Sequence, residues 1–191
     1  MYRTSNSIPS LSRSILIGAL GFCLVSLIVF ATVAFAERWM YANVGLTGAY
    51  LVWIALFILL GGGALGSLVV DRWRLPKFYL LFGAAFFAYA IGWTAAYFTL
   101  RGAAGEWVGS LAASVLMAIV FAIGFGALRS LLRLSAVLFA TNSIAYFLGS
   151  VLFRVIRPPF GMLSWGVIYG LFLGAGIGAV LNLCQTSRSV K

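Results

Sequence analysis

The sequence predicts an all-α integral membrane protein, a bundle of six transmembrane helices joined by short loops. Hydrophobic residues make up 63% of the chain and charged residues only 8%, and the mean hydropathy is +1.10, far outside the range of soluble domains. Six uncharged runs also reach the roughly 20 residues that a helix needs to cross a bilayer. These predicted spans are Ser14–Ala36, Leu46–Val70, Phe78–Leu100, Val108–Leu128, Leu134–Phe153 and Phe160–Gln185. One membrane domain is therefore expected over residues 14–185, between basic tails at 1–13 and 186–191.

The first predicted span has two interpretations. Ala34-Phe35-Ala36 before Glu37 has the small-x-small form of a signal-peptidase site, and cleavage there would leave five spans. The apolar run is, however, much longer than the roughly 7 to 15 residues of a signal-peptide core. We therefore expect this helix to be retained.

The sequence predicts an internal repeat, in which the second and third spans resemble the fourth and fifth in parallel orientation. Residues 61–68 (GGGALGSL) match residues 124–131 (GFGALRSL) at six of eight positions. Chance similarity is the alternative, because both segments are rich in Gly, Ala and Leu. Between the second and third spans, Asp71 is expected to pair with a neighbouring arginine.

The fifth span carries a polar cluster near its middle, Thr141-Asn142-Ser143. Asn142 needs a hydrogen-bond partner there, because no lipid headgroup reaches that depth. An interhelical hydrogen bond is the ordinary solution, and a substrate or water path is the other. The turn that follows contains Arg154 and Arg157 before a proline pair, and these arginines are candidates to attract an anionic ligand.

The sixth span carries a glycine at every fourth position. Small residues allow close packing between helices in lipid, either within one chain or between chains. Shorter sets occur in the second and fourth spans. The predicted packing or oligomer face comprises Gly62, Gly66, Ala118, Ala122, Gly126, Gly166, Gly170, Gly174 and Gly178.

The arginines and lysines predict the topology. With the N-terminus in the cytoplasm, nine of the 13 lie inside and four outside, which obeys the positive-inside rule. Both termini are therefore expected on the cytoplasmic side of a bacterial-type membrane. The inner set is Arg3, Arg13, Arg72, Arg74, Lys77, Arg129, Arg133, Arg188 and Lys191, and the outer set is Arg38, Arg101, Arg154 and Arg157.

Most tryptophans and several tyrosines fall in the outer third of this topology. An aromatic belt at the headgroups is one explanation. Trp53, Trp93 and Trp165, however, lie about one and a half to two helical turns below the ends of their spans. Together with Tyr169 they predict, as the other explanation, an outward-opening aromatic pocket.

Several classes of function lack the residues they need. The chain has no histidine, three acidic residues and two cysteines, so neither a metal or haem site nor a nucleophile-base pair is expected. No cofactor, nucleic-acid partner or enzymatic activity is predicted.

Two functions remain open. The first is binding or transport of an uncharged or aromatic small molecule in the outward-facing pocket. Its candidate ligand-binding residues are Asn142, Thr141, Ser143, Trp53, Trp93, Trp165, Tyr169, Arg154 and Arg157. The second is a non-catalytic structural or assembly subunit of a larger membrane complex, with other membrane proteins or further copies of the chain as partners.

Overall fold

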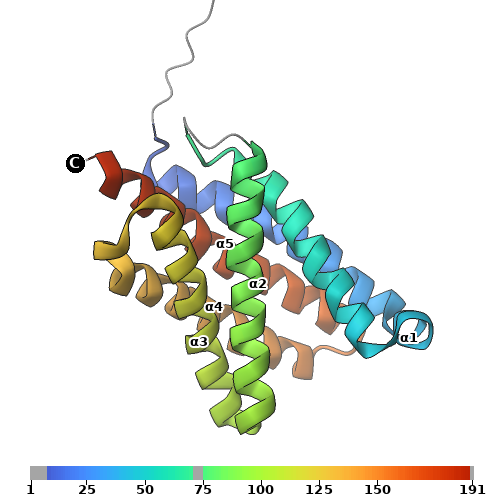
Figure 1. Ribbon diagram of the computed structural model, residues 1–191. Helices are drawn as coiled ribbons and strands as arrows, with labels where there is room; N and C mark the ends of the chain where they lie inside the picture. Colours follow the sequence, from blue (N-terminus) through green and yellow to red (C-terminus); the bar gives the residue numbers. More distant parts are fainter. Residues whose placement is uncertain (1–7, 71–74, 190–191) are drawn as a thin grey trace, which may run out of the picture.

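The computed structural model describes residues 8–70 and 75–189, which are helical over most of their length and contain no strand (Figure 1). The elements are α1 (Leu11–Gly66), α2 (Leu75–Leu100), α3 (Gly102–Phe125), the short 3-10 helix η1 (Leu128–Ser130), α4 (Leu131–Val155) and α5 (Phe160–Ser189). All five α-helices are long and apolar enough to cross a membrane. The chain is thus an all-helical bundle of the kind that multi-pass membrane proteins form. Arg3, Arg72, Arg74, Lys191 and the expected Asp71 ion pair lie outside the described residues.

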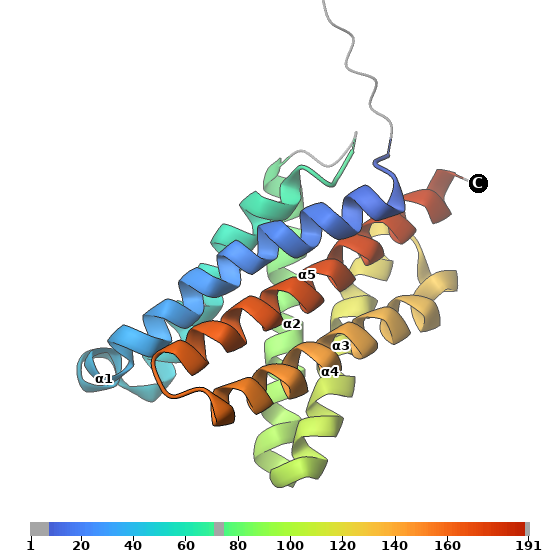
Figure 2. The ribbon, with the colours of Figure 1, turned by 180° about the vertical axis from the view of Figure 1, so that it is seen from behind.

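Helix α1 reverses direction, as Figure 2 shows, and its one residue with non-helical backbone angles is Gly45. Gly45 has a φ of 69°, in a region that residues with a Cβ rarely adopt. The segments before and after it pack against each other, with the Phe22 and Phe57 rings 5.6 Å apart. Residues 11–44 and 46–66 therefore lie side by side in opposite directions.

The helix boundaries differ from those of the predicted spans at several places. The first helix does not stop at Ala36 but continues to residue 44, because the polar residues after Ala36 extend the helix until Gly45 breaks it. The second stops at Gly66 rather than Val70. The fourth ends at Phe125 rather than Leu128, because Gly126 adopts the left-handed conformation that terminates helices.

The predicted internal repeat is not confirmed. Gly126 corresponds in that alignment to Gly63, which lies within helical α1, whereas Gly126 has a φ of 69°. Gly126 makes no packing contact within the chain, since a Cβ there would meet nothing within 4 Å. Its role in this fold is to end α3.

Helix α5 is the most buried of the apolar helices and packs mainly against α1 and α4 (Figure 2). Its glycines lie against the first half of α1 in antiparallel order: a Cβ at Gly166 would be 2.7 Å from that of Phe30, and one at Gly178 would clash with the Ser14 carbonyl. The predicted small-residue face of this helix is therefore covered within the chain.

The other predicted packing residues also have contacts inside the chain. Gly62 leaves room for the ring of Tyr79, and Gly66 faces Leu75 at the start of α2. Ala118 and Ala122 in α3 are fully buried. These small residues permit neighbouring helices to approach where larger side chains would separate them.

Two polar residues of α5 hold both ends of α1 at one end of the bundle. The Asn182 amide donates to the carbonyl of Pro9 at 2.6 Å. The Gln185 amide donates to the Leu68 carbonyl at 3.0 Å, and its oxygen accepts from the Val70 N–H at 2.9 Å. Gln185 thereby satisfies two backbone groups of the segment just after the end of α1.

We expect Gln185→Leu to lower the free energy of unfolding by about 1 to 3 kcal/mol, because it leaves two backbone groups without their partner. Thermal unfolding in detergent measures this loss. Thr99→Val is the control, since Thr99 is exposed and bonds a carbonyl of its own helix. Equal unfolding temperatures for Gln185→Leu and wild type would show that Gln185 does not stabilise this end of the bundle.

Candidate functional site

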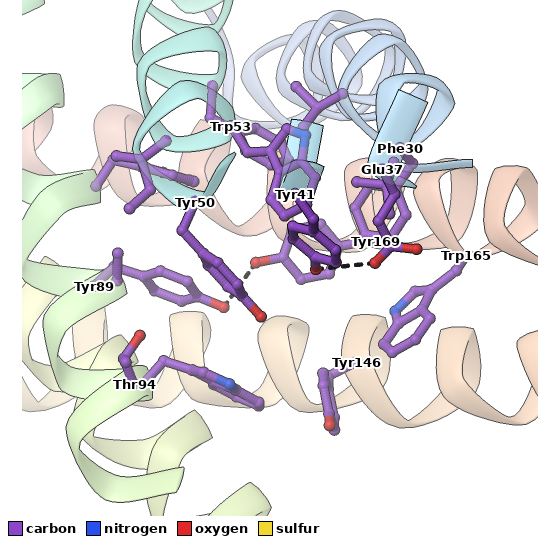
Figure 3. A pocket seen from close by; sticks show the side chains of 17 residues that line it. Phe30, Glu37, Tyr41, Tyr50, Trp53, Tyr89, Thr94, Tyr146, Trp165 and Tyr169 are labelled. Atoms are coloured by element: carbon purple, nitrogen blue, oxygen red, sulfur yellow. Dashed lines mark hydrogen bonds between the residues drawn. The ribbon is translucent and has the colours of Figure 1, made fainter. Parts of the chain in front are cut away.

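A cavity of about 330 Å³ lies between α1, α2, α4 and α5, close to the reversal of α1 at Gly45 (Figure 3). Its lining is largely aromatic. The lining residues are Val29, Phe30, Val33, Glu37, Tyr41, Tyr50, Trp53, Ile54, Phe57, Phe86, Tyr89, Ala90, Trp93, Thr94, Tyr146, Trp165 and Tyr169.

The structure brings together the three tryptophans and the tyrosine singled out in the sequence. Trp53 comes from the second half of α1, Trp93 from α2, and Trp165 and Tyr169 from α5, and all four line the cavity. Tyr146 of α4 links two of them, with its ring 4.5 Å from that of Trp93 and 5.6 Å from that of Trp165. The aromatic lining is thus built from four helices.

A chain of buried hydrogen bonds leads from the cavity wall into the helix bundle. The Tyr89 and Tyr169 hydroxyls lie 2.7 Å apart (Figure 3). The Tyr89 hydroxyl also lies 2.7 Å from the Asn142 amide oxygen, and the Asn142 amide nitrogen donates to Ser110 at 2.9 Å. Ser110 in turn lies 2.8 Å from the Ser143 hydroxyl.

These hydrogen bonds show how two of the predicted polar residues, Asn142 and Ser143, relate to the cavity. Asn142 is fully buried and has the interhelical hydrogen bonds that its depth requires. Neither Asn142 nor Ser143 lines the cavity. Asn142 instead fixes the hydroxyl of Tyr89, which does line it.

The other three predicted ligand-binding residues lie away from the cavity. Thr141 donates to the Val137 carbonyl of its own helix and packs against Gly176 of α5. Arg154 and Arg157 are exposed, and the Arg154 guanidinium is held by Ser150 at 3.0 Å. The side chains of residues three or four apart share a helix face, which directs Arg154 along α4 instead of into the cavity.

The predicted ligand-binding residues leave out six lining residues with polar groups: Glu37, Tyr41, Tyr50, Tyr89, Thr94 and Tyr146. Glu37 and Tyr41 were expected in a loop, but the continuation of α1 past Ala36 brings both to the cavity. Tyr89 lies deeper in its span than the tryptophans. Its spacing of four residues from Trp93, which places both on one helix face, was a usable signal.

Two polar groups of the lining tryptophans are buried without a hydrogen-bond partner among the described residues. They are the indole N–H groups of Trp53 and Trp165. An unpaired buried donor costs free energy, and tryptophan N–H groups usually find a partner when buried. The N–H edge of the Trp165 indole lies against Gly149 of α4, so this donor is enclosed by the protein, and both donors stay unsatisfied in the wall of the cavity.

The described residues contain no group of three His, Cys, Asp or Glu side chains that could hold a metal ion. Cys23 and Cys184 are both free thiols. The chemistry that this site offers is aromatic contact, hydrogen bonding and the carboxylate of Glu37.

Comparison of the chain with protein-family models, with curated proteins and with solved structures finds no match.

Proposed function

We propose that this multi-pass membrane protein binds a small aromatic molecule in the cavity beside Gly45, as a binding or transport protein. The observation that carries the proposal is the meeting of Trp53, Trp93 and Trp165 from three helices around one cavity. Its volume of about 330 Å³ is at the lower end of the range for small-molecule sites, which are mostly apolar with a few polar groups.

In this proposal the two halves of α1 each cross the membrane, which gives six crossings with both termini in the cytoplasm. Four basic residues assigned to the inside lie at or near the starts of helices α1, α2 and α4 and in η1: Arg13, Lys77, Arg129 and Arg133. The four basic residues assigned to the outside, Arg38, Arg101, Arg154 and Arg157, lie near the reversal of α1, the α2–α3 junction and the α4–α5 turn. This distribution supports the positive-inside orientation and an outward-facing cavity.

The polar groups of the cavity favour a ligand that has a hydrogen-bonding atom as well as apolar surface. The two indole N–H groups lack partners, and the hydroxyls of Tyr89 and Tyr169 are fixed by their mutual hydrogen bond. A ligand with a polar atom would meet the tyrosine hydroxyls in the cavity wall, while its ring would contact the aromatic side chains.

The packing of α5 favours this function over the alternative of a structural subunit. Gly166, Gly170, Gly174 and Gly178 are covered by residues of α1, so this face is not open to a partner.

A titration with 1-naphthalenemethanol, a neutral aromatic probe, tests the proposal. Calorimetry on protein in nanodiscs of uncharged lipid, with empty nanodiscs subtracted, measures the affinity. We expect Trp93→Ala to weaken binding about tenfold or more, because an aromatic contact and its buried area are lost. Trp39→Ala is the matched control, since Trp39 is 66% exposed and is not part of the lining.

A second variant tests the same cavity without removing a contact. Ala90 lines the cavity, so Ala90→Phe should fill part of it and also abolish probe binding. Unfolding temperatures of all variants are measured on the same samples. Saturable binding that survives both Trp93→Ala and Ala90→Phe in folded protein would place the probe elsewhere and overturn the proposal.

A further inference from the structure

We infer that the ligand carries a positively charged nitrogen, held at the mouth of the cavity by the carboxylate of Glu37 and the rings of Tyr41, Tyr50 and Trp53. This inference rests on the proposed function and specifies the chemical class of its ligand as an aromatic amine or ammonium compound.

The four side chains come together because α1 reverses at Gly45. Glu37 and Tyr41 lie on one helix face before the reversal, and Tyr50 and Trp53 lie after it (Figure 3). The Tyr41 and Tyr50 rings lie 6.0 and 5.4 Å from the Trp53 ring, at interplanar angles of 70° and 69°. Two rings thus stand nearly perpendicular to a third beside the carboxylate.

Glu37 is the single charged residue among the described residues that line the cavity. It is half-buried, and its Oε1 accepts a hydrogen bond from the Tyr41 hydroxyl at 3.0 Å. A carboxylate in apolar surroundings is stabilised by a cationic partner. The lining supplies none, although the whole chain carries a net charge of +10.

The aromatic rings around Glu37 suit the same ligand. The faces of tryptophan and tyrosine attract cations, and aromatic cages are a common means of recognising ammonium groups. Tyr41 and Tyr50 are 37% and 47% exposed, so these rings are accessible from outside the bundle. Trp53 is 9% exposed and forms the inner wall.

The arginines near this end of the bundle favour the opposite charge but do not line the cavity. Arg38 and Arg154 are both exposed, and the Arg154 guanidinium is bonded to Ser150. Their charges are screened by water and salt, whereas Glu37 is in the lining itself. The charge in direct contact with a ligand is therefore the negative charge of Glu37, which favours a cation over an anion.

Three probes that share one ring system test the inference: 1-naphthylmethylammonium, the neutral 1-naphthalenemethanol and the anionic 1-naphthoate. Each is titrated by calorimetry into protein in nanodiscs of uncharged lipid. We expect the ammonium probe to bind about tenfold more tightly than the alcohol, which corresponds to about 1.4 kcal/mol. Glu37→Gln should remove this difference by weakening ammonium binding alone, since glutamine keeps an acceptor for Tyr41.

Glu106→Gln is the matched control, because Glu106 also accepts a tyrosine hydroxyl, from Tyr146 at 3.2 Å, but is not part of the lining. Equal binding of the ammonium and the alcohol, unchanged in Glu37→Gln, would overturn the charge inference and leave the proposed function standing. Tightest binding of the naphthoate would overturn it in favour of an anion. Absence of binding by all three probes would overturn both proposals.

Discussion

Gly174→Leu is expected to prevent the bundle from assembling. A Cβ at position 174 would clash with the carbonyl oxygen of Gly18 and lie 2.6 Å from the Cβ of Phe22. Backbone atoms cannot move aside as the end of a flexible side chain can, so α1 and α5 would have to separate. In lipid, close packing over small residues is a main source of cohesion between helices, and we expect a loss of at least about 3 kcal/mol.

The measurement is the yield of monodisperse protein in mild detergent, together with its unfolding temperature. Ala175→Leu is the control, because Ala175 is the next residue of α5 and is only partly buried. A Gly174→Leu protein that purifies and unfolds like wild type would contradict the contact between α1 and α5.

Asn142→Ala is expected to lower both stability and ligand affinity. The substitution removes the acceptor of Tyr89 and the donor to Ser110, and it leaves a small void at a fully buried position. We expect a loss of about 1 to 3 kcal/mol in the free energy of unfolding. Probe binding should weaken as well, because Tyr89 loses one of the two hydrogen bonds that orient its hydroxyl toward the cavity.

Thr141→Val serves as the matched control for Asn142→Ala. Thr141 is the preceding residue and bonds carbonyls of its own helix, and valine has nearly the same shape. Thermal unfolding and the naphthalenemethanol titration are run on both variants. If Asn142→Ala unfolds at the wild-type temperature and binds the probe normally, the buried hydrogen-bond chain has no role in holding the site.

The helices could be predicted from the sequence because membrane spans leave a simple signal, a long uncharged apolar run. The reversal of α1 was harder to place. Polar residues such as Glu37 and Asn43 suggested a loop, yet they are compatible with a helix once it leaves the hydrocarbon, and the chain stays helical until Gly45. The left-handed conformation of Gly45 depends on how the two halves of α1 pack against each other. The residues next to Gly45 in the sequence do not determine that packing.

The site was predictable in part, for a similar reason. The depth of Trp53, Trp93 and Trp165 in their spans indicates an aromatic cluster, and the three residues line one cavity. The partner of Asn142 was not predictable, because Tyr89 is 53 residues away and lies on α2, which packs against α3 and α1 rather than against α4. Position alone favours Arg154 and Arg157 as ligand-binding residues, but both side chains are exposed and neither lines the cavity.

The central claim is that the aromatic cavity holds a small molecule, and native mass spectrometry tests it most directly. Wild type, Trp93→Ala and Trp39→Ala would be extracted gently from their own membranes and analysed intact. The claim predicts a bound molecule of defined mass on wild type and Trp39→Ala that is lost from Trp93→Ala. Proteins bound in fixed stoichiometry to all three chains, with no small molecule on any of them, would contradict the claim and identify the protein as a subunit of a membrane complex.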